Sequence, residues 1–123
     1  MILKSFIVEK NINSLDLYTS VLIYGVNTGI KEDLKLRIKS LNKDAEIINL
    51  FEDFILKNKS VLYENILNQS LFSKKKIIFI YNATDKLLDE IEQHLENKNV
   101  KIFIFSDNLE KKSKLRSTFE KSQ

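Results

Sequence analysis

A turn bracketed by glycines is the first candidate for chemistry, because it directly follows an apolar run. Gly25 and Gly29, the only glycines in the chain, come after Val21–Tyr24, and Lys31 and Glu32 follow them. A nucleotide-binding P-loop has four residues between its glycines and continues as Gly-Lys-Ser/Thr. Here three residues separate the glycines, Lys31 comes one place late, and Glu32 stands where a hydroxyl would hold magnesium. The pattern indicates a degenerate P-loop and favours a tight strand-to-helix turn.

The second element of a nucleotide hydrolase would be an acidic pair at the end of a buried strand, where it holds magnesium and activates water. The apolar run Ile77–Ile80 ends instead in Tyr81 and Asn82, and neither can replace an Asp-Glu pair. Asp85 follows three residues later and is interpreted as a helix cap, with Thr84 as the alternative cap of the helix that follows. Two independent catalytic elements are therefore missing.

No other catalytic set is evident. The single histidine, His94, lies in a charged stretch, so we expect it to be solvated. The absence of Cys excludes disulfides, thiolate zinc sites and a cysteine nucleophile. No Ser or Thr lies in a nucleophile-elbow pattern. We expect no catalytic residue, no metal and no cofactor.

The segment before the strand at residue 77 combines two large apolar residues with polar neighbours. Leu71 and Phe72 are flanked by Ser70 and Ser73, preceded by Gln69, and followed by Lys74–Lys76, which we expect to lie in water. A helix of about 100° per residue continued from residues 61–69 would turn both apolar side chains away from its inward face. They either pack beneath the sheet edge or form an exposed hydrophobic plug that binds a partner protein.

Continuous apolar runs alternate with amphipathic stretches along the chain. We expect strands at residues 21–24, 45–50, 77–81 and 100–105, and a strand or packed arm at 2–8. We expect helices at 30–41, 61–69 with Ser60 as N-cap, from 87 to near 97, and 112–120, a short helix at 15–18, and a connecting turn at 51–55. The inward positions of the helices are Ile30, Leu34, Ile38, Leu41, Leu62, Tyr63, Ile66, Leu67, Leu115 and Phe119. This alternation predicts a three-layer α/β domain, a parallel sheet with helices on both faces.

Composition limits the class of protein to which the chain can belong. The 123 residues suffice for one domain, and 43% hydrophobic with 30% charged residues is ordinary for a globular protein. A net charge of +3 is too small and scattered to indicate nucleic-acid binding by this segment alone. No apolar run is long enough for a membrane helix, and the start lacks the form of a signal peptide, so we expect a cytoplasmic protein. Because the chain stops after a helix without a linker, we expect residues 1–123 to be a fragment of a longer polypeptide.

Several of these segments together resemble one family, the N-terminal domain of the delta subunit of the bacterial DNA polymerase III clamp loader, of the alphaproteobacterial kind. Leu22–Gly25 is similar to the family's first strand and degenerate P-loop turn. The family's most recognisable segment is similar to Asn68–Ser73, followed by Lys75 and the strand at 77–80. Asn82-Ala83 and Lys111–Arg116 also fit. The resemblance covers the whole length.

The resemblance implies a divergent AAA+-like domain, related to P-loop NTPases, that does not hydrolyse ATP. Such a domain binds the ring-shaped sliding clamp (the beta subunit) through a Leu-Phe pair, here Leu71 and Phe72 flanked by Gln69, Ser70 and Ser73, and opens it during DNA replication. The other loader subunits (gamma/tau and delta prime) supply the ATPase, and the polymerase holoenzyme supplies the DNA-directed DNA polymerase activity, so contact with DNA is indirect. The family's lid and collar domains are missing here. Two alternatives stay open, an active P-loop hydrolase with an atypical loop and a purely structural α/β domain.

Overall fold

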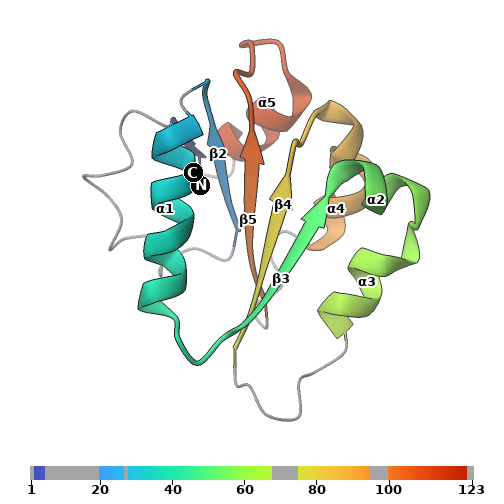
Figure 1. The fold of residues 1–123 in the computed structure, drawn as a ribbon. Coiled ribbons are helices and arrows are strands. Elements are labelled where there is room, and N and C mark those ends of the chain that lie inside the picture. Colours follow the sequence, from blue (N-terminus) through green and yellow to red (C-terminus); the bar gives the residue numbers. More distant parts are fainter. Residues whose placement is uncertain (1, 5–19, 27, 68–74, 95–99, 122–123) are drawn as a thin grey trace.

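The computed structural model describes residues 2–4, 20–26, 28–67, 75–94 and 100–121 (Figure 1). Its strands are β1 (Ile2–Lys4), β2 (Ser20–Tyr24), β3 (Glu46–Phe51), β4 (Lys76–Tyr81) and β5 (Val100–Ser106). Its helices are α1 (Thr28–Leu41), α2 (Glu52–Lys57), α3 (Ser60–Leu67), α4 (Leu88–Ile91) and α5 (Lys114–Lys121). Short 3₁₀ turns, η3 (Asp85–Leu87) and η4 (Glu92–His94), flank α4.

The strands form one parallel sheet in the order β1-β2-β5-β4-β3. Residues of β2, β4 and β5 lie in register across its centre, with Val21 beside Phe103 and Phe103 beside Phe79. All three strands are buried over most of their length. Burial on both faces explains why the strands are continuous apolar runs without polar alternation.

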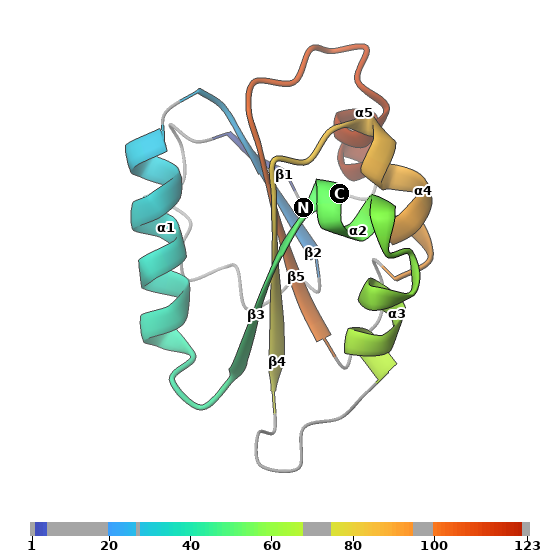
Figure 2. The same ribbon diagram turned by 45° about the vertical axis from the view of Figure 1, so that its right-hand side comes forward.

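Helices cover both faces of the sheet unequally, as Figure 2 shows. Among the described helices, α1 lies on one face, and α2, α3, α4 and α5 lie on the other. From β2 the chain crosses to the far edge strand β3, and then returns through β4 to β5. Because parallel crossovers are right-handed, reversing the direction of travel along the sheet moves the connecting helices to the opposite face. The predicted three-layer α/β architecture is thus present.

Two hydrophobic clusters fill the space between the layers. Under α1, Leu34 and Ile38 pack with Phe79 and Phe103 of the sheet. On the other face, the larger cluster contains Leu22, Ile78, Ile104, Ile55, Leu62, Leu87, Ile91, Leu115 and Phe119. Leu115 and Phe119 therefore face inward, as predicted.

The structure corrects several local predictions. Residues 51–55, predicted as a turn, are the end of β3 and the start of α2. Ser60 is the first residue of α3, and not the residue that caps it. Leu41 and Tyr63, predicted to face inward, are 56% and 51% exposed. Leu41 is the last residue of α1, one turn past the buried Ile38, and the Tyr63 ring lies beside that of His94. The helix predicted from residue 87 is interrupted by the 3₁₀ geometry of η4. The helix predicted at 15–18 lies outside the described residues.

Lys76 is a further correction, because it was expected in water and is 8% exposed. Its ammonium donates a hydrogen bond to the carbonyl oxygen of Asn65, at 2.6 Å. Lys75 is exposed, as predicted, and Lys74 lies outside the described residues. A lysine can occupy this position because its stem packs as an apolar chain while its amine reaches an acceptor.

Candidate functional site

The carboxyl ends of β2 and β5 mark the topological switch point of the sheet. These strands are neighbours, yet β2 leads into α1 on one face and β5 leads toward α5 on the other. In open α/β sheets, ligands bind in the crevice outside such a point. The degenerate P-loop predicted from the sequence lies there.

Gly25 and Lys31 both bind the end of β5. Gly25 has φ 141°, a conformation that favours glycine, and its amide donates to the carbonyl oxygen of Asp107 at 3.3 Å. The ammonium of Lys31 donates to the carbonyl oxygen of Ser106 at 3.2 Å and to Oδ1 of Asp107 at 3.4 Å. Gly29 is the second residue of α1. The residues predicted as a degenerate P-loop are thus brought together, with the Lys31 amine directed to the protein's own chain.

Polar residues also follow β3 and β4, but they bind each other. Glu52 is 5% exposed and accepts hydrogen bonds from the amide and hydroxyl of Thr84, each at 2.8 Å. The hydroxyl of Tyr81 donates to Oδ1 of Asn49 at 2.6 Å, and burial raises the pKa of Tyr81. Sequence reasoning missed Glu52, although an acidic residue directly after an apolar run was a visible signal. The Glu52 carboxylate holds the chain after β4 against the start of α2.

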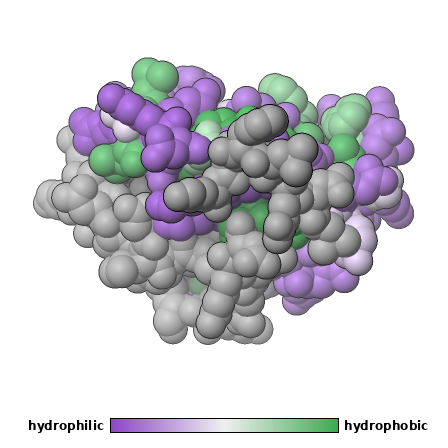
Figure 3. Space-filling view, turned by 90° about the horizontal axis from the view of Figure 1, so that it is seen from below, coloured by the Kyte–Doolittle hydropathy of each residue, from purple (hydrophilic) through white to green (hydrophobic). Residues whose placement is uncertain are grey.

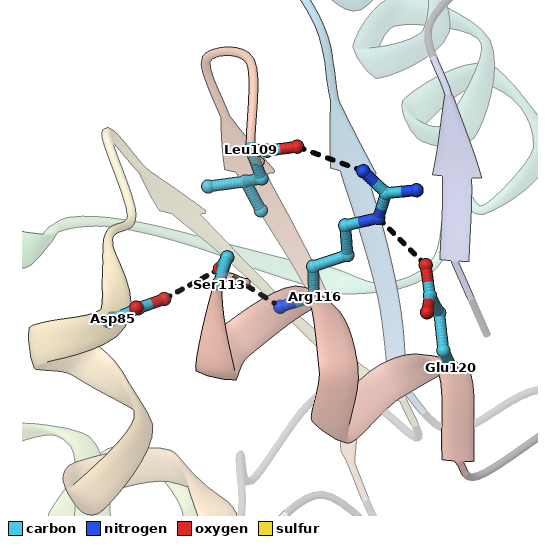
Figure 4. Close-up of polar contacts among 5 residues, drawn as sticks. All are labelled: Asp85, Leu109, Ser113, Arg116 and Glu120. Carbon is cyan, nitrogen blue, oxygen red and sulfur yellow. Dashed lines mark hydrogen bonds and ion pairs between the residues drawn. The ribbon is translucent and has the colours of Figure 1, made fainter. Parts of the chain in front are cut away.

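The sequence predicts Thr84 or Asp85 as the cap of the next helical segment; Thr84 is that cap, and α5 is capped by Asp85 (Figure 4). Its carboxylate accepts hydrogen bonds from the Ser113 hydroxyl at 2.6 Å and from the amides of Lys114 and Leu115 at 3.2 and 3.1 Å. These amides open α5, whereas η3 is capped by Thr84, which accepts from the amide of Lys86. The hydrogen bond from Ser113, with those from the two amides, lowers the pKa of Asp85.

Arg116 connects α5 to two other parts of the fold. Its Nε donates to Glu120 at 2.7 Å, its Nη1 donates to the carbonyl oxygen of Leu109 at 3.1 Å, and its guanidinium lies 5.3 Å from the centre of the Tyr24 ring. The arginine therefore ties α5 to β2 and to the chain that follows β5.

An open depression of about 470 Å³ lies beside this cap. Its lining residues come from the chain after β4 and the chain after β5, and they are Thr84, Asp85, Lys86, Asn108, Leu109, Glu110, Lys112 and Ser113. Acidic and basic side chains alternate along it, and Asp85 and Ser113 are already hydrogen-bonded to each other. The lining matches no single class of ligand.

His94 is buried, which corrects the prediction of a solvated side chain. It is 7% exposed, and its ring lies 5.7 Å from that of Tyr63 in α3. Burial lowers the pKa of His94. The prediction judged His94 by its neighbours Glu92 and Gln93, which are exposed, whereas the His94 ring itself packs against α3.

The predicted partner-binding residues Gln69, Ser70, Leu71, Phe72 and Ser73 lie outside the described residues. What is described is the chain on either side of them. The bond from Lys76 to Asn65 joins the first residue of β4 to the last turns of α3. Figure 3 views the end of the molecule at which β4 begins, where the described surface is mostly hydrophilic with separate hydrophobic areas.

The described part of the chain contains neither a cluster of metal ligands nor a membrane-spanning helix. Its acidic and histidine side chains form no group of three that could hold a metal ion. None of its helices is long and apolar enough to cross a membrane.

Comparison with known proteins adds no relative. No protein-family model, no curated protein and no solved structure matches the chain.

Proposed function

We propose that this chain is a non-catalytic, AAA+-like domain that binds and opens a ring-shaped sliding clamp during DNA replication. Leu71 and Phe72 enter a hydrophobic pocket of the clamp, with Gln69, Ser70 and Ser73 around them. The rigid parallel sheet supports this contact. Sister subunits of the loader, present with the full-length protein in the cytoplasm, supply ATP hydrolysis.

The arrangement of Lys31 is the observation that carries the non-catalytic part of this proposal. A P-loop lysine reaches the β- and γ-phosphates of the nucleotide. Here the Lys31 amine donates to Ser106 and Asp107. At the end of β4, Tyr81 and Asn82 stand where magnesium and water would need carboxylates. A domain with both features is better suited to binding than to hydrolysis.

The partner-binding part is supported by the anchoring of α3 and β4. Leu62 and Ile66 fix α3 in the core, β4 is buried, and Lys76 joins the two elements. A segment whose two ends are held costs less entropy to order on binding. Burying a Leu and a Phe side chain contributes about 1.5–3 kcal/mol each, enough to dominate a small contact.

The test is binding of the chain to the sliding clamp of the same organism, measured by calorimetry or surface plasmon resonance. We expect the double variant Leu71→Ala/Phe72→Ala to lose at least about 3 kcal/mol of binding free energy, a loss of more than a hundredfold in affinity. The matched control is Leu36→Ala/Phe54→Ala, which removes an equally apolar pair that is 62% and 49% exposed in α1 and α2. Parental affinity in the Leu71/Phe72 variant would show that the site is wrong.

A nucleotide titration separates the proposal from an active P-loop hydrolase. We expect no saturable binding of magnesium ATP at micromolar concentration. Saturable binding that disappears in Lys31→Ala would overturn the non-catalytic assignment. A domain with a structural role alone would bind neither nucleotide nor clamp.

A further inference from the structure

Strand β3 is an edge of the sheet. Its one neighbour in the sheet is β4, and Figure 2 shows β3 at the front of the molecule, with no described element along its outer side. An edge strand presents unpaired backbone groups that can pair with another chain.

The pairing with β4 identifies which residues face outward. The amide of Glu46 donates to the carbonyl oxygen of Lys75 at 2.9 Å. In a parallel ladder, alternate residues direct both backbone groups to the same neighbour, so Glu46, Ile48 and Leu50 face β4. The backbone groups of Ile47, Asn49 and Phe51 therefore point to the open side.

Apart from the charge of Glu46 at its first position, the strand lacks the usual devices that protect an edge. Proteins block such edges with Pro, Lys, a bulge or a covering element. The sequence of β3, Glu-Ile-Ile-Asn-Leu-Phe, contains neither Pro nor Lys, and its register with β4 runs without interruption from residue 46 to residue 51. Asn49 is exposed, and Phe51 is 53% exposed.

We propose that β3 pairs with β3 of a second copy of this chain, antiparallel and about a two-fold axis at Asn49. In this register Asn49 faces Asn49 of the copy, Ile47 faces Phe51, and Ile48 faces Leu50. Every outward backbone group of Ile47, Asn49 and Phe51 then finds a partner, because residues directly opposite one another exchange both hydrogen bonds. Apart from the central Asn49 pair, the side-chain pairs are apolar, and an aromatic ring opposite a β-branched residue is a favourable cross-strand pair.

Charge favours a second copy as the occupant. Lys43 and Lys75 are exposed at the start of β3, and Asp53 is exposed just after its end. Antiparallel pairing brings the basic end of each strand to the acidic end of the other. Asp44 and Glu46 offset part of this attraction. Glu46 would face Glu52 of the copy, but the Glu52 carboxylate is directed inward to Thr84.

The test is sedimentation velocity over a range of protein concentration from low to high micromolar. We expect a reversible monomer–dimer equilibrium. Asn49→Pro removes an outward amide and keeps the backbone ladder with β4, although it also removes the acceptor of the Tyr81 hydroxyl. It should weaken the dimer about tenfold or more without unfolding the chain. Phe51→Lys, an edge charge, should weaken it similarly, whereas Phe54→Lys, an exposed aromatic of α2, should not.

Circular dichroism is the control that measures whether each variant is folded. A chain that stays monomeric at every concentration overturns the proposal. So does a dimer that Asn49→Pro and Phe51→Lys leave intact, because that dimer uses another surface. Sedimentation measures self-association and not clamp binding, so the proposed dimer and the proposed clamp contact can each fail without the other.

Discussion

At the scale of single residues, polar side chains in this domain hold parts of the chain that are far apart in sequence. Asp85 and Ser113 are separated by 28 positions, and Glu52 and Thr84 by 32. Sequence reasoning allowed Thr84 or Asp85 to cap the adjacent helical segment, and Thr84 does so. The role of Asp85 at α5 was not predicted, because a local pattern contains no information about a helix that comes later. The same limit applies to His94, whose neighbours are charged although its own ring is buried.

Replacing Asp85 tests the remote cap. Asp85→Asn should lower the free energy of unfolding by about 0.5–2 kcal/mol, the usual cost of a lost cap. The pKa of Asp85 is lowered below its ordinary value of 3.8, so the charged form is stabilised in the folded state. The difference between parent and variant should be constant above about pH 5 and should shrink as pH falls through 3.8 and below.

Urea denaturation at several pH values measures that difference. Asp44→Asn, a change at an exposed turn residue, is the control and should stay within about 0.5 kcal/mol at each pH. An Asp85→Asn variant as stable as the parent at neutral pH would contradict the cap.

His94 gives a second pH dependence, in a higher range. Burial lowers its pKa below the ordinary value of 6.5, so the unfolded chain takes up a proton before the folded chain does. The stability that neutral His94 contributes is present in full above pH 6.5 and is lost as the pH falls below that value. His94→Phe keeps a ring beside Tyr63 and should flatten the change in unfolding free energy between about pH 7.5 and 5.5. An equally steep change in that variant would assign the effect to other groups.

At the scale of elements, the sequence predicted those helices and strands in which burial makes the apolar residues periodic or continuous. The strands β2, β4 and β5 were found within one or two residues, because a strand covered on both faces must be apolar throughout. The edge strand β3 was found as closely, from its apolar pair Ile47 and Ile48. Helix α2 was missed, because six residues are too few to show a helical period. Leu41 was misassigned for a related reason, since periodicity identifies a face but not how far along it the sheet extends.

A pair of leucines in α1 measures how much the buried face contributes. Leu34 is 1% exposed and Leu36 is 62% exposed in the same helix. Leu34→Ala should lower the free energy of unfolding by about 2–5 kcal/mol, through lost burial and the cavity left behind. Leu36→Ala makes the same chemical change on the outer face and should alter stability by no more than about 0.5 kcal/mol. Thermal or urea unfolding of both variants gives the comparison, and equal losses would contradict the observed face.

At the scale of the whole molecule, strand order is the feature that the sequence could not supply. Alternating elements predict a parallel α/β domain, but several orders satisfy the same pattern. The observed order brings β2 beside β5, and this places Gly25 and Lys31 against Ser106 and Asp107. The degenerate turn was therefore predictable as a motif, and its binding to β5 was not. Leu71 and Phe72 stay a prediction for the clamp experiment to test.

The shared sheet also links the two hydrophobic clusters, since neighbouring residues of one strand belong to opposite cores. In β4, Ile78 packs toward α3 and α4, while Phe79 packs toward α1. A strand cannot lose one cluster and keep its packing in the other, so we expect a single cooperative unfolding transition. Leu34→Ala on the α1 side and Leu115→Ala on the α5 side should both lower the protection of amides in β2, β4 and β5 against hydrogen exchange. Faster exchange confined to α1 in Leu34→Ala, with the strands as protected as in the parent, would show that the two faces unfold separately.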